Sequence, residues 1–252
     1  MKVDNISFSY RQHKAVDQLS LKIVENEITT IIGANGCGKS TLFYLMTKNL
    51  KPDEGTIFLK EKNISAIHLK DFSKMVSIVH QQNKAPGDIT VEKLVSYGRT
   101  PYIPLHRSKT KEDYSYIEWA LDTTNLIDYK DELVSNLSGG QKQRVWIAMA
   151  LAQNTKILFL DEPTTYLDIR YQIEILKLIQ KLKEDYGMTI IIILHDINQS
   201  LYFSDQIIGM KKGKIVAQGN PDEIITSEVI EEIYDIHLDV MWWNKKKFVV
   251  TI

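Results

Sequence analysis

The sequence predicts an α/β protein built on a mainly parallel β-sheet, and three features of its pattern support this fold class. Two short, mostly aliphatic runs, 156–160 and 189–194, have the length and the β-branched content of buried strands. Each is followed by a longer stretch with helical spacing, at 169–186 and 197–203. A third apolar strand, 28–32, leads into a glycine-rich loop. Strands that alternate with helices favour a parallel sheet flanked by helices.

The remaining segments fit around this core. The first 32 residues are typical of strands, and the alternation of polar and apolar residues at 20–23 indicates a half-buried strand. Further short strands are expected around 56–59 and 76–79, whereas residues 90–152 look mainly helical. We therefore expect one domain over residues 1–252, with a helical subdomain inserted at about 86–152.

Composition excludes several classes of protein. The 252 residues include 31 basic and 32 acidic side chains, for a net charge of −1, so we expect no nucleic-acid partner. The single cysteine, Cys37, leaves no partner for an internal disulfide. The longest purely aliphatic run, 190–194, is far shorter than the roughly 20 residues of a transmembrane helix. If the protein works at a membrane, we expect a partner to hold it there.

The glycine-rich loop fits the pattern G-x-x-x-x-G-K-[ST], between a β-branched strand and a helical stretch at 39–48. Backbone N–H groups in such a loop surround phosphate oxygens, and the helix N-terminus adds positive potential. Lys39 then supplies a charge to the β- and γ-phosphates, Ser40 offers a hydroxyl to Mg²⁺, and Thr41 is a further candidate phosphate contact. Cys37 is interpreted as a small filler residue. The loop that would bind the phosphates consists of Gly33, Ala34, Asn35, Gly36, Cys37, Gly38, Lys39 and Ser40.

Two acidic residues end the strand at 157–160. The carboxyl ends of parallel strands are where ligands bind in open α/β sheets. Asp161 is placed to hold Mg²⁺, directly or through water, as strand-end aspartates do in phosphate-loop enzymes. Glu162 points elsewhere and can orient or deprotonate an attacking water. The alternative is an exposed acidic turn before Pro163.

A second small-residue motif precedes a helical run at 141–152. Ser138 and two glycines before a helix make another anion-binding N-terminus, about 100 residues after the first. One ATP has a single triphosphate tail, so the two helix starts cannot both be filled by one bound tail. The motif reads Leu137, Ser138, Gly139, Gly140 and Gln141.

These motifs, in this order, resemble the ATP-binding cassette (ABC) family over essentially the whole chain. The resemblance implies a phosphate-loop NTPase fold with a mainly parallel core, an N-terminal antiparallel β subdomain and a helical subdomain that carries the signature. It implies an ATPase that binds ATP and Mg²⁺. It also implies a homodimer, because in this family Ser138, Gly139, Gly140 and Gln141 would contact ATP held by the other subunit.

The resemblance assigns two further residues of the nucleotide site. Tyr10 matches the aromatic side chain that stacks on adenine, with a core position in a strand as the alternative. His195 follows the strand at 190–194 and matches the histidine that contacts the γ-phosphate, although a lone histidine after an apolar run is often structural.

The same resemblance assigns a glutamine and a loop. Gln81 matches the residue that senses Mg²⁺ and the γ-phosphate, and because Gln82 is adjacent the register can slip by one residue. Residues 165–168 match the loop through which the subunits meet, with Asp168 as its key residue. Tyr166 stands where the family more commonly has a small residue. The catalytic residues that the resemblance implies are Lys39, Gln81, Glu162 and His195.

Four stretches resemble the importer subgroup that handles ferric siderophores, haem and vitamin B12. We therefore expect an ATP-hydrolysing subunit that powers import of a ferric siderophore through a membrane permease, with an extracytoplasmic binding protein as an indirect partner. The expected location is the cytoplasmic face of the membrane. Alternatives are a haem, vitamin B12 or zinc/manganese importer and, in a different class, an ABC ATPase without a transport role. The four stretches are 86–91, 97–102, 146–149 and 194–199.

Overall fold

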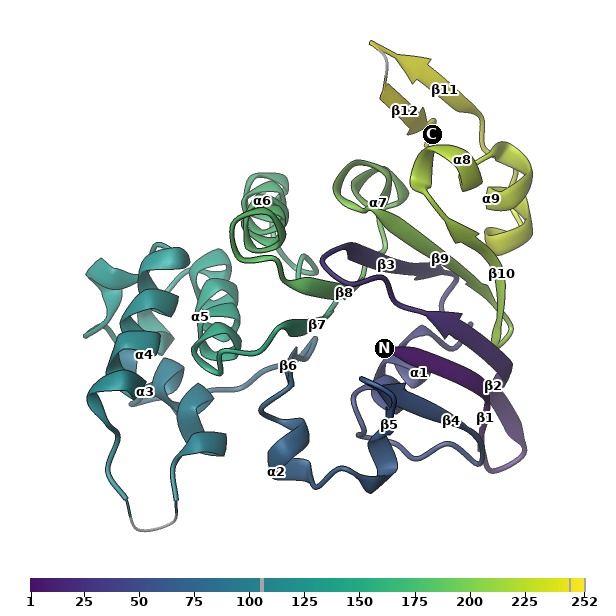
Figure 1. Cartoon of the computed structure of the whole chain (residues 1–252). Coiled ribbons are helices and arrows are strands. Elements are labelled where there is room, and N and C mark those ends of the chain that lie inside the picture. Colours follow the sequence, from purple (N-terminus) through teal and green to yellow (C-terminus); the bar gives the residue numbers. More distant parts are fainter. Residues whose placement is uncertain (105–106, 245, 252) are drawn as a thin grey trace. The chain divides into compact units, whose positions relative to one another are not determined.

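The computed structural model describes residues 1–104, 107–244 and 246–251, and its contacts divide the chain into two compact units. The first unit comprises Met1–Ile67 and Lys183–Ile252, and the second comprises His68–Leu182. Figure 1 labels the helices and strands of both units, which are described here one at a time. No helix in the described part of the chain is long and apolar enough to cross a membrane.

The first unit contains an antiparallel sheet of four strands in the order β2-β1-β4-β5. Residues 19–22 of β2 alternate between buried and exposed, and the register of β1 and β2 pairs Val3 with Leu21 and Ile6 with Leu19. The expected N-terminal antiparallel β subdomain is therefore confirmed. Its strands are β1 (Lys2–Tyr10), β2 (His13–Lys22), β4 (Glu54–Leu59) and β5 (Lys62–Asn63).

The parallel strands of the first unit centre on β3 (Ile28–Gly33). It pairs in parallel with β8 (Thr189–Ile193) on one side and β9 (Gln206–Lys211) on the other, and β10 (Lys214–Gly219) extends the sheet antiparallel to β9. Every residue of β3 and β8 is buried, which explains their continuous apolar sequence. The other elements of this unit are α1 (Lys39–Met46), η1 (Ile64–Ala66), α7 (Ile197–Phe203), α8 (Pro221–Ile224) and α9 (Ser227–Tyr234).

The chain ends in a two-stranded hairpin of β11 (Val240–Trp243) and β12 (Lys246–Val249). The side-chain amide of Asn198, on α7, donates to the carbonyl oxygen of Val249 at 3.0 Å and accepts from its N–H at 2.7 Å. Val249 itself is buried in an apolar cluster that includes Ile32, the residue directly before the phosphate loop. The C-terminal hairpin is thus joined to the core that supports this loop.

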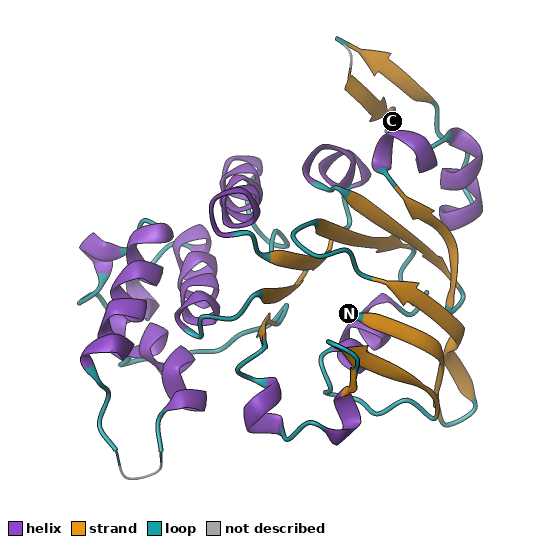
Figure 2. Cartoon of the chain, in the orientation of Figure 1, coloured by secondary structure: helices purple, strands orange, loops and turns teal. Residues whose placement is uncertain are grey.

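The second unit combines two parallel strands with most of the helices (Figure 2). Strands β6 (Val76–Val79) and β7 (Ile157–Asp161) pair in register, and each has a mostly buried sequence. The expected helical region is confirmed between them. The helices that begin in this unit are α2 (Leu69–Phe72), α3 (Val91–Ser96), η2 (Tyr97–Tyr102), α4 (Lys111–Thr123), η3 (Ile127–Tyr129), η4 (Val134–Asn136), α5 (Gly139–Ala152) and α6 (Ile169–Tyr186).

A buried ion pair connects helices η2, α4 and α5 of the second unit. The Arg99 guanidinium lies 2.9 Å from the Asp113 carboxylate and stacks on the rings of Tyr102 and Tyr116. It also donates to the carbonyl oxygen of Ala152 at 2.9 Å, at the end of α5. Although burial disfavours the charged carboxylate, hydrogen bonds from Thr110 and Arg99 hold the pKa of Asp113 below its usual range. We expect this network to favour one arrangement of the surrounding helices.

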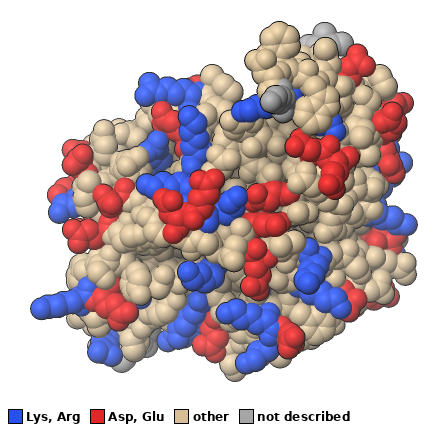
Figure 3. Space-filling model, turned by 45° about the horizontal axis from the view of Figure 1, so that its top comes forward, with Lys and Arg blue, Asp and Glu red and all other residues tan. Residues whose placement is uncertain are grey.

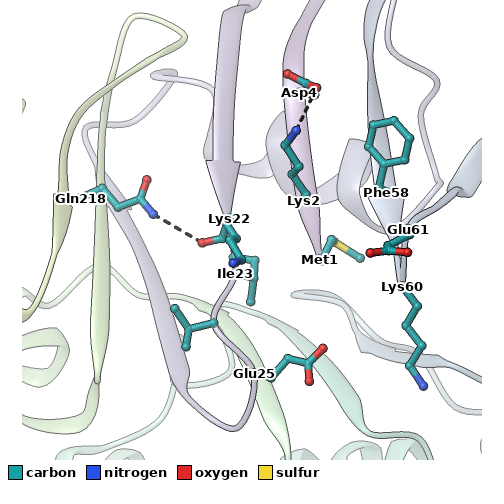
Figure 4. Close-up of a pocket in the computed structure, with 11 residues that line it drawn as sticks. Met1, Lys2, Asp4, Lys22, Ile23, Glu25, Phe58, Lys60, Glu61 and Gln218 are labelled. Atoms are coloured by element: carbon teal, nitrogen blue, oxygen red, sulfur yellow. Dashed lines mark hydrogen bonds and ion pairs between the residues drawn. The ribbon is translucent and has the colours of Figure 1, made fainter.

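Charged side chains of both signs are interspersed on the face drawn in Figure 3, in keeping with the nearly neutral net charge. A large open cavity of about 1090 Å³ lies in the first unit beside the ends of β1 and β2 (Figure 4). Lysines and acids line it together, including Lys2, which pairs with Asp4 at 3.1 Å. The lining residues are Met1, Lys2, Asp4, Lys22, Ile23, Val24, Glu25, Phe58, Lys60, Glu61 and Gln218.

Candidate active site

Two glycines of the phosphate loop, Gly33 and Gly38, have no room for a side chain. Gly38 has a φ of +108°, and a Cβ there would lie 2.3 Å from the carbonyl oxygen of Ala15. Gly33 is equally restricted, because its Cβ would lie 2.4 Å from the carbonyl oxygen of Met210. The loop is also held by the N–H of Gly213, which donates to the carbonyl oxygen of Cys37 at 2.8 Å. Its backbone path is therefore fixed by neighbouring backbone.

The first residues of α1 present the groups expected to meet phosphate. The ammonium of Lys39 donates to the carbonyl oxygens of Gly33 at 2.7 Å and Ala34 at 3.1 Å, so it lies over the loop. The side of the loop at Asn35, Gly36 and Ser40 is exposed. Thr41 is largely buried one residue further on. This arrangement is the strand–loop–helix site that binds phosphate in phosphate-loop proteins.

Two side chains support the loop from inside the first unit. Cys37 is buried, and burial raises the pKa of its thiol, which suits a filler rather than a nucleophile. Tyr234, on α9, lies beside the backbone of Gly33, and burial raises the pKa of its hydroxyl to about 12. Its hydroxyl therefore remains neutral at physiological pH. Nothing in the sequence pattern indicated Tyr234, which is nearly 200 residues from the loop it supports.

Tyr10 and His195 also belong to the first unit. Tyr10 is the last residue of β1, is 47% exposed and packs edge-on against Phe8, with ring centroids 4.9 Å apart. That exposure excludes the alternative of a core aromatic. His195 is exposed two residues after the end of β8, and Asp196 caps α7 by accepting from the N–H of Gln199 at 2.9 Å. Both side chains are accessible to a ligand.

The carboxylate pair lies in the second unit at the end of β7. Asp161 is its last residue and is only 2% exposed, whereas Glu162 follows it with a φ of +50°. Gln81 lies two residues after β6. Its side-chain N–H donates to Oε2 of Glu162, with 2.5 Å between the nitrogen and the oxygen. The structure thus brings Gln81 together with Glu162, in keeping with the parallel pairing of β6 and β7.

The signature motif begins α5 in the same unit. Ser138 caps the helix by accepting from the N–H of Gln141 at 3.3 Å, and the Gln141 side chain accepts from the N–H of Ser138 at 2.9 Å. A Cβ on Gly140 would lie 2.5 Å from the ring of Tyr171, so only glycine fits there. The exposed Ser138 and Gly139 form the accessible part of this helix start.

The loop after the carboxylates joins these elements. The Asp168 carboxylate accepts from the N–H of Tyr171 at 3.1 Å and so caps α6. Tyr166 in this loop is 88% exposed and has a left-handed backbone, with a φ of +65°. The hydroxyl of its neighbour Thr165 donates to the Glu162 carboxylate at 3.2 Å. Left-handed conformations at residues other than glycine cost about 1–3 kcal/mol each and persist where the surrounding contacts hold them. Sequence reasoning missed the contact of Thr165, for which no spacing rule exists.

The predicted site residues therefore fall into two groups. The first unit carries Tyr10, the phosphate loop with Lys39, Ser40 and Thr41, and His195; the second carries Gln81, the signature residues 138–141, Asp161, Glu162 and Asp168. Each group suits a different part of MgATP. The first offers cationic and N–H groups, which suit phosphate. The second offers oxygen atoms, which suit a hard cation, and a second helix N-terminus.

Comparison with known proteins identifies the class of protein. Residues 16–165, more than half of the chain, match the family described as ABC transporter. The chain belongs to the ABC transporter family, and the predicted ABC ATPase fold and activity are confirmed.

Two individual relatives are similar to this chain over nearly its full length. The chain is 39% identical to the petrobactin import ATP-binding protein FpuC of Bacillus anthracis, over 98% of this chain and 91% of that protein. It is also 39% identical to the iron(3+)-hydroxamate import ATP-binding protein FhuC of Bacillus subtilis (strain 168), over 96% and 90%.

Solved structures give the same fold. An inward-facing conformation of a putative metal-chelate type ABC transporter matches with a TM-score of 0.86 and 27% identity, over 99% of this chain and 94% of that one. The dimeric structure of MJ0796, a bacterial ABC transporter cassette, matches with a TM-score of 0.75 and 28% identity, over 87% and 98%.

Proposed function

We propose that this chain hydrolyses ATP to power import of a ferric-siderophore-type substrate through a membrane permease. The observation that carries the substrate class is the near full-length similarity to two import proteins named for petrobactin and iron(3+)-hydroxamate. In the subgroup stretch at 97–102, Arg99 is buried in an ion pair with Asp113 and therefore has a structural role. We therefore infer the transported substrate from the similarity to related importers and not from a substrate-binding site in this chain.

The proposed reaction is transfer of the γ-phosphoryl group of ATP to water. Glu162 polarises the attacking water, and Lys39 and His195 stabilise charge on the γ-phosphate. Tyr10 stacks on adenine, and the N–H groups of the phosphate loop bind the phosphate oxygens. Such catalysis depends mostly on positioning and electrostatic stabilisation, which suits a site built from backbone N–H groups and few charged side chains.

The proposed ligands of Mg²⁺ are Ser40, Gln81 and Asp161. All three offer oxygen, the atom type that this hard cation prefers. The amide nitrogen of Gln81 is the atom that bonds Glu162, so its oxygen is the atom available to a cation. Bound there, Mg²⁺ would supply positive charge to the β- and γ-phosphate oxygens.

We infer a homodimer in which ATP lies between the phosphate loop of one subunit and residues 138–141 of the other. Two observations support it: the chain carries one copy of each phosphate-binding helix start, and the related MJ0796 cassette was solved as a dimer. ATP would then favour the closed dimer, and hydrolysis would release it, as in other ligand-biased two-state systems.

The proposed docking place for the permease is the segment that follows Gln81. A cavity of about 180 Å³ lies there, large enough for one protruding side chain of a docked helix. Docking would hold the protein at the cytoplasmic face of the membrane and would bring an extracytoplasmic binding protein into the same system. The cavity is lined by Asn83, Ala85, Pro86, Gly87, Val134, Ser135, Lys142 and Trp146.

Uptake of radioactive iron tests the proposal. A host strain lacking this protein is offered a panel of ferric siderophores and is complemented with wild type or with Lys39→Ala. We expect uptake of one siderophore class to be lost and to return only with wild type. Unchanged iron uptake across the panel would refute the siderophore assignment, and the same strains would then be assayed with haem, vitamin B12, zinc and manganese.

A further inference from the structure

The helix that follows His195 is bonded to the last strand of the chain. Asn198 is the second residue of α7, and its side-chain amide donates to the carbonyl oxygen of Val249 at 3.0 Å. The same amide accepts from the N–H of Val249 at 2.7 Å. One side chain thus takes both hydrogen-bonding groups of a backbone residue in β12, at the end of α7 that lies next to His195.

Two further contacts join β12 to the same helix. The Val249 side chain is only 1% exposed and packs in an apolar cluster with Leu201, a buried residue of α7. Near the other end of the helix, the Lys246 ammonium donates to the hydroxyl of Tyr202 at 2.9 Å. A helix of seven residues has little stability of its own, so we expect these contacts to set its position.

The backbone of His195 is joined to the start of α7 through one residue, Asp196. The Asp196 carboxylate accepts from the N–H of Gln199 at 2.9 Å. Its carbonyl oxygen accepts from the N–H of Ser200 at 3.0 Å and from the Ser200 hydroxyl at 2.8 Å. A displacement of the first turn of α7 therefore displaces the backbone of His195 with it.

We propose that Asn198 is a positioning residue for His195, and that the C-terminal strand β12 belongs to the structure that places this histidine at the γ-phosphate. The inference rests on the proposed function, in which His195 stabilises charge on the γ-phosphate. It also gives a role to Asn198 within the stretch 194–199, one of the four that resemble the importer subgroup, which the nucleotide site by itself does not explain.

The expected effect falls on the chemical step and not on ATP binding. The loop at 33–40, which is proposed to bind the phosphates, is held by other contacts, including the bond from the N–H of Gly213 to the carbonyl oxygen of Cys37. A displacement of a catalytic group by about 1 Å can lower a rate by about 100-fold. Loss of Asn198 should cost less than this, because the contacts of Leu201 and Tyr202 with β12 remain.

The test replaces Asn198 in the full-length protein and measures ATP hydrolysis. For Asn198→Ala we expect kcat to fall about fivefold while KM for ATP stays within twofold of wild type. The matched control is Asn220→Ala, in the same unit. It removes an asparagine that accepts from the N–H of Asp222 at 3.0 Å at the start of α8, and its kcat should stay within twofold of wild type.

A double-mutant cycle shows whether the loss acts through His195. In a His195→Ala background, measured in single turnover with radiolabelled ATP, Asn198→Ala should cause less than a twofold further loss, because the side chain that it positions is gone. Hydrogen exchange followed by mass spectrometry tests the contact itself. The C-terminal peptide that contains the N–H of Val249 should exchange faster in Asn198→Ala than in wild type.

Several results would overturn the proposal. They are a kcat of Asn198→Ala within twofold of wild type, a loss as large in Asn220→Ala, the full fivefold loss in the His195→Ala background, or unchanged exchange of the C-terminal peptide. If Asn198→Ala does not fold, the nearly isosteric Asn198→Asp takes its place. That variant sets a carboxylate oxygen against the carbonyl oxygen of Val249, and a wild-type kcat for it would likewise refute the proposal. Failure of the proposed function is distinguishable, because His195→Ala itself would then retain wild-type turnover.

Discussion

The phosphate loop of the first unit and the carboxylate loop of the second bend sharply by different means. In the phosphate loop the left-handed conformations belong to glycines, and at Gly33 and Gly38 a neighbouring carbonyl oxygen occupies the space where a Cβ would be. In the carboxylate loop they belong to Glu162 and Tyr166, which carry full side chains, and hydrogen bonds between side chains hold the loop.

The difference in construction suits the role that we propose for each loop. A loop that binds phosphate with its N–H groups needs a fixed backbone and gains nothing from side chains. The loop proposed to direct a carboxylate toward water and to meet a second subunit needs particular side chains in particular orientations. Strain at residues other than glycine persists there because the surrounding contacts over-determine it.

The largest expected effect concerns the chemical step of the carboxylate loop. Glu162→Gln should lower kcat for ATP by about 10²–10⁴-fold, the usual contribution of a general base, while ATP affinity is retained. The ATP-bound dimer should then accumulate, which light scattering after size-exclusion chromatography measures. The control is Glu118→Gln, an exposed acid of α4 in the same unit. Turnover of Glu162→Gln within a few-fold of wild type would contradict the assignment.

A smaller effect is expected when the backbone of the phosphate loop is disturbed. Gly38→Ala places a Cβ 2.3 Å from a carbonyl oxygen, so we expect a loss of about 2–4 kcal/mol in unfolding free energy and at least tenfold weaker nucleotide binding. Denaturant unfolding and nucleotide titration measure the two quantities. Gly36→Ala is the matched control, because its φ of +77° is also left-handed but its Cβ meets no atom within 4 Å. Equal losses in both variants would show that conformation, and not the close contact, sets the cost.

The smallest effect concerns strain in the carboxylate loop. Tyr166→Gly removes a left-handed tyrosine and should raise the unfolding free energy by about 0.5–1 kcal/mol, while weakening the ATP-dependent dimer. Tyr114→Gly, an exposed position inside α4, should instead lower it by about as much. Denaturant unfolding of both variants tests this difference, and a loss of stability in Tyr166→Gly would contradict the strain argument.

Much of the fold followed from local sequence patterns. The continuous apolar runs at β3, β7 and β8 fixed the buried strands, and the helices α6 and α7 begin and end at the predicted residues. The C-terminal hairpin could not be predicted in this way. It depends on Asn198, whose amide pairs with the backbone of a residue 51 positions later.

The residues of the candidate site likewise differ in whether a local sequence pattern could predict them. Groups that act through the backbone have a fixed spacing, so the loop at 33–40 and the start of α5 at Ser138 were recognisable as motifs. Groups that act through contacts between side chains have no such spacing. The bond of Thr165 to Glu162 and the place of Tyr234 beside Gly33 depend on how distant elements pack, which no short pattern records.

The burial of Cys37 gives the protein a built-in reporter. It is the only sulfhydryl in the chain, and both its lack of access and its raised pKa slow its reaction with alkylating reagents. Any modification must therefore follow an opening of the segment around it, so the rate of labelling measures how often that segment opens. Mass spectrometry of the intact chain can follow this motion without an engineered probe, in purified protein or in cells.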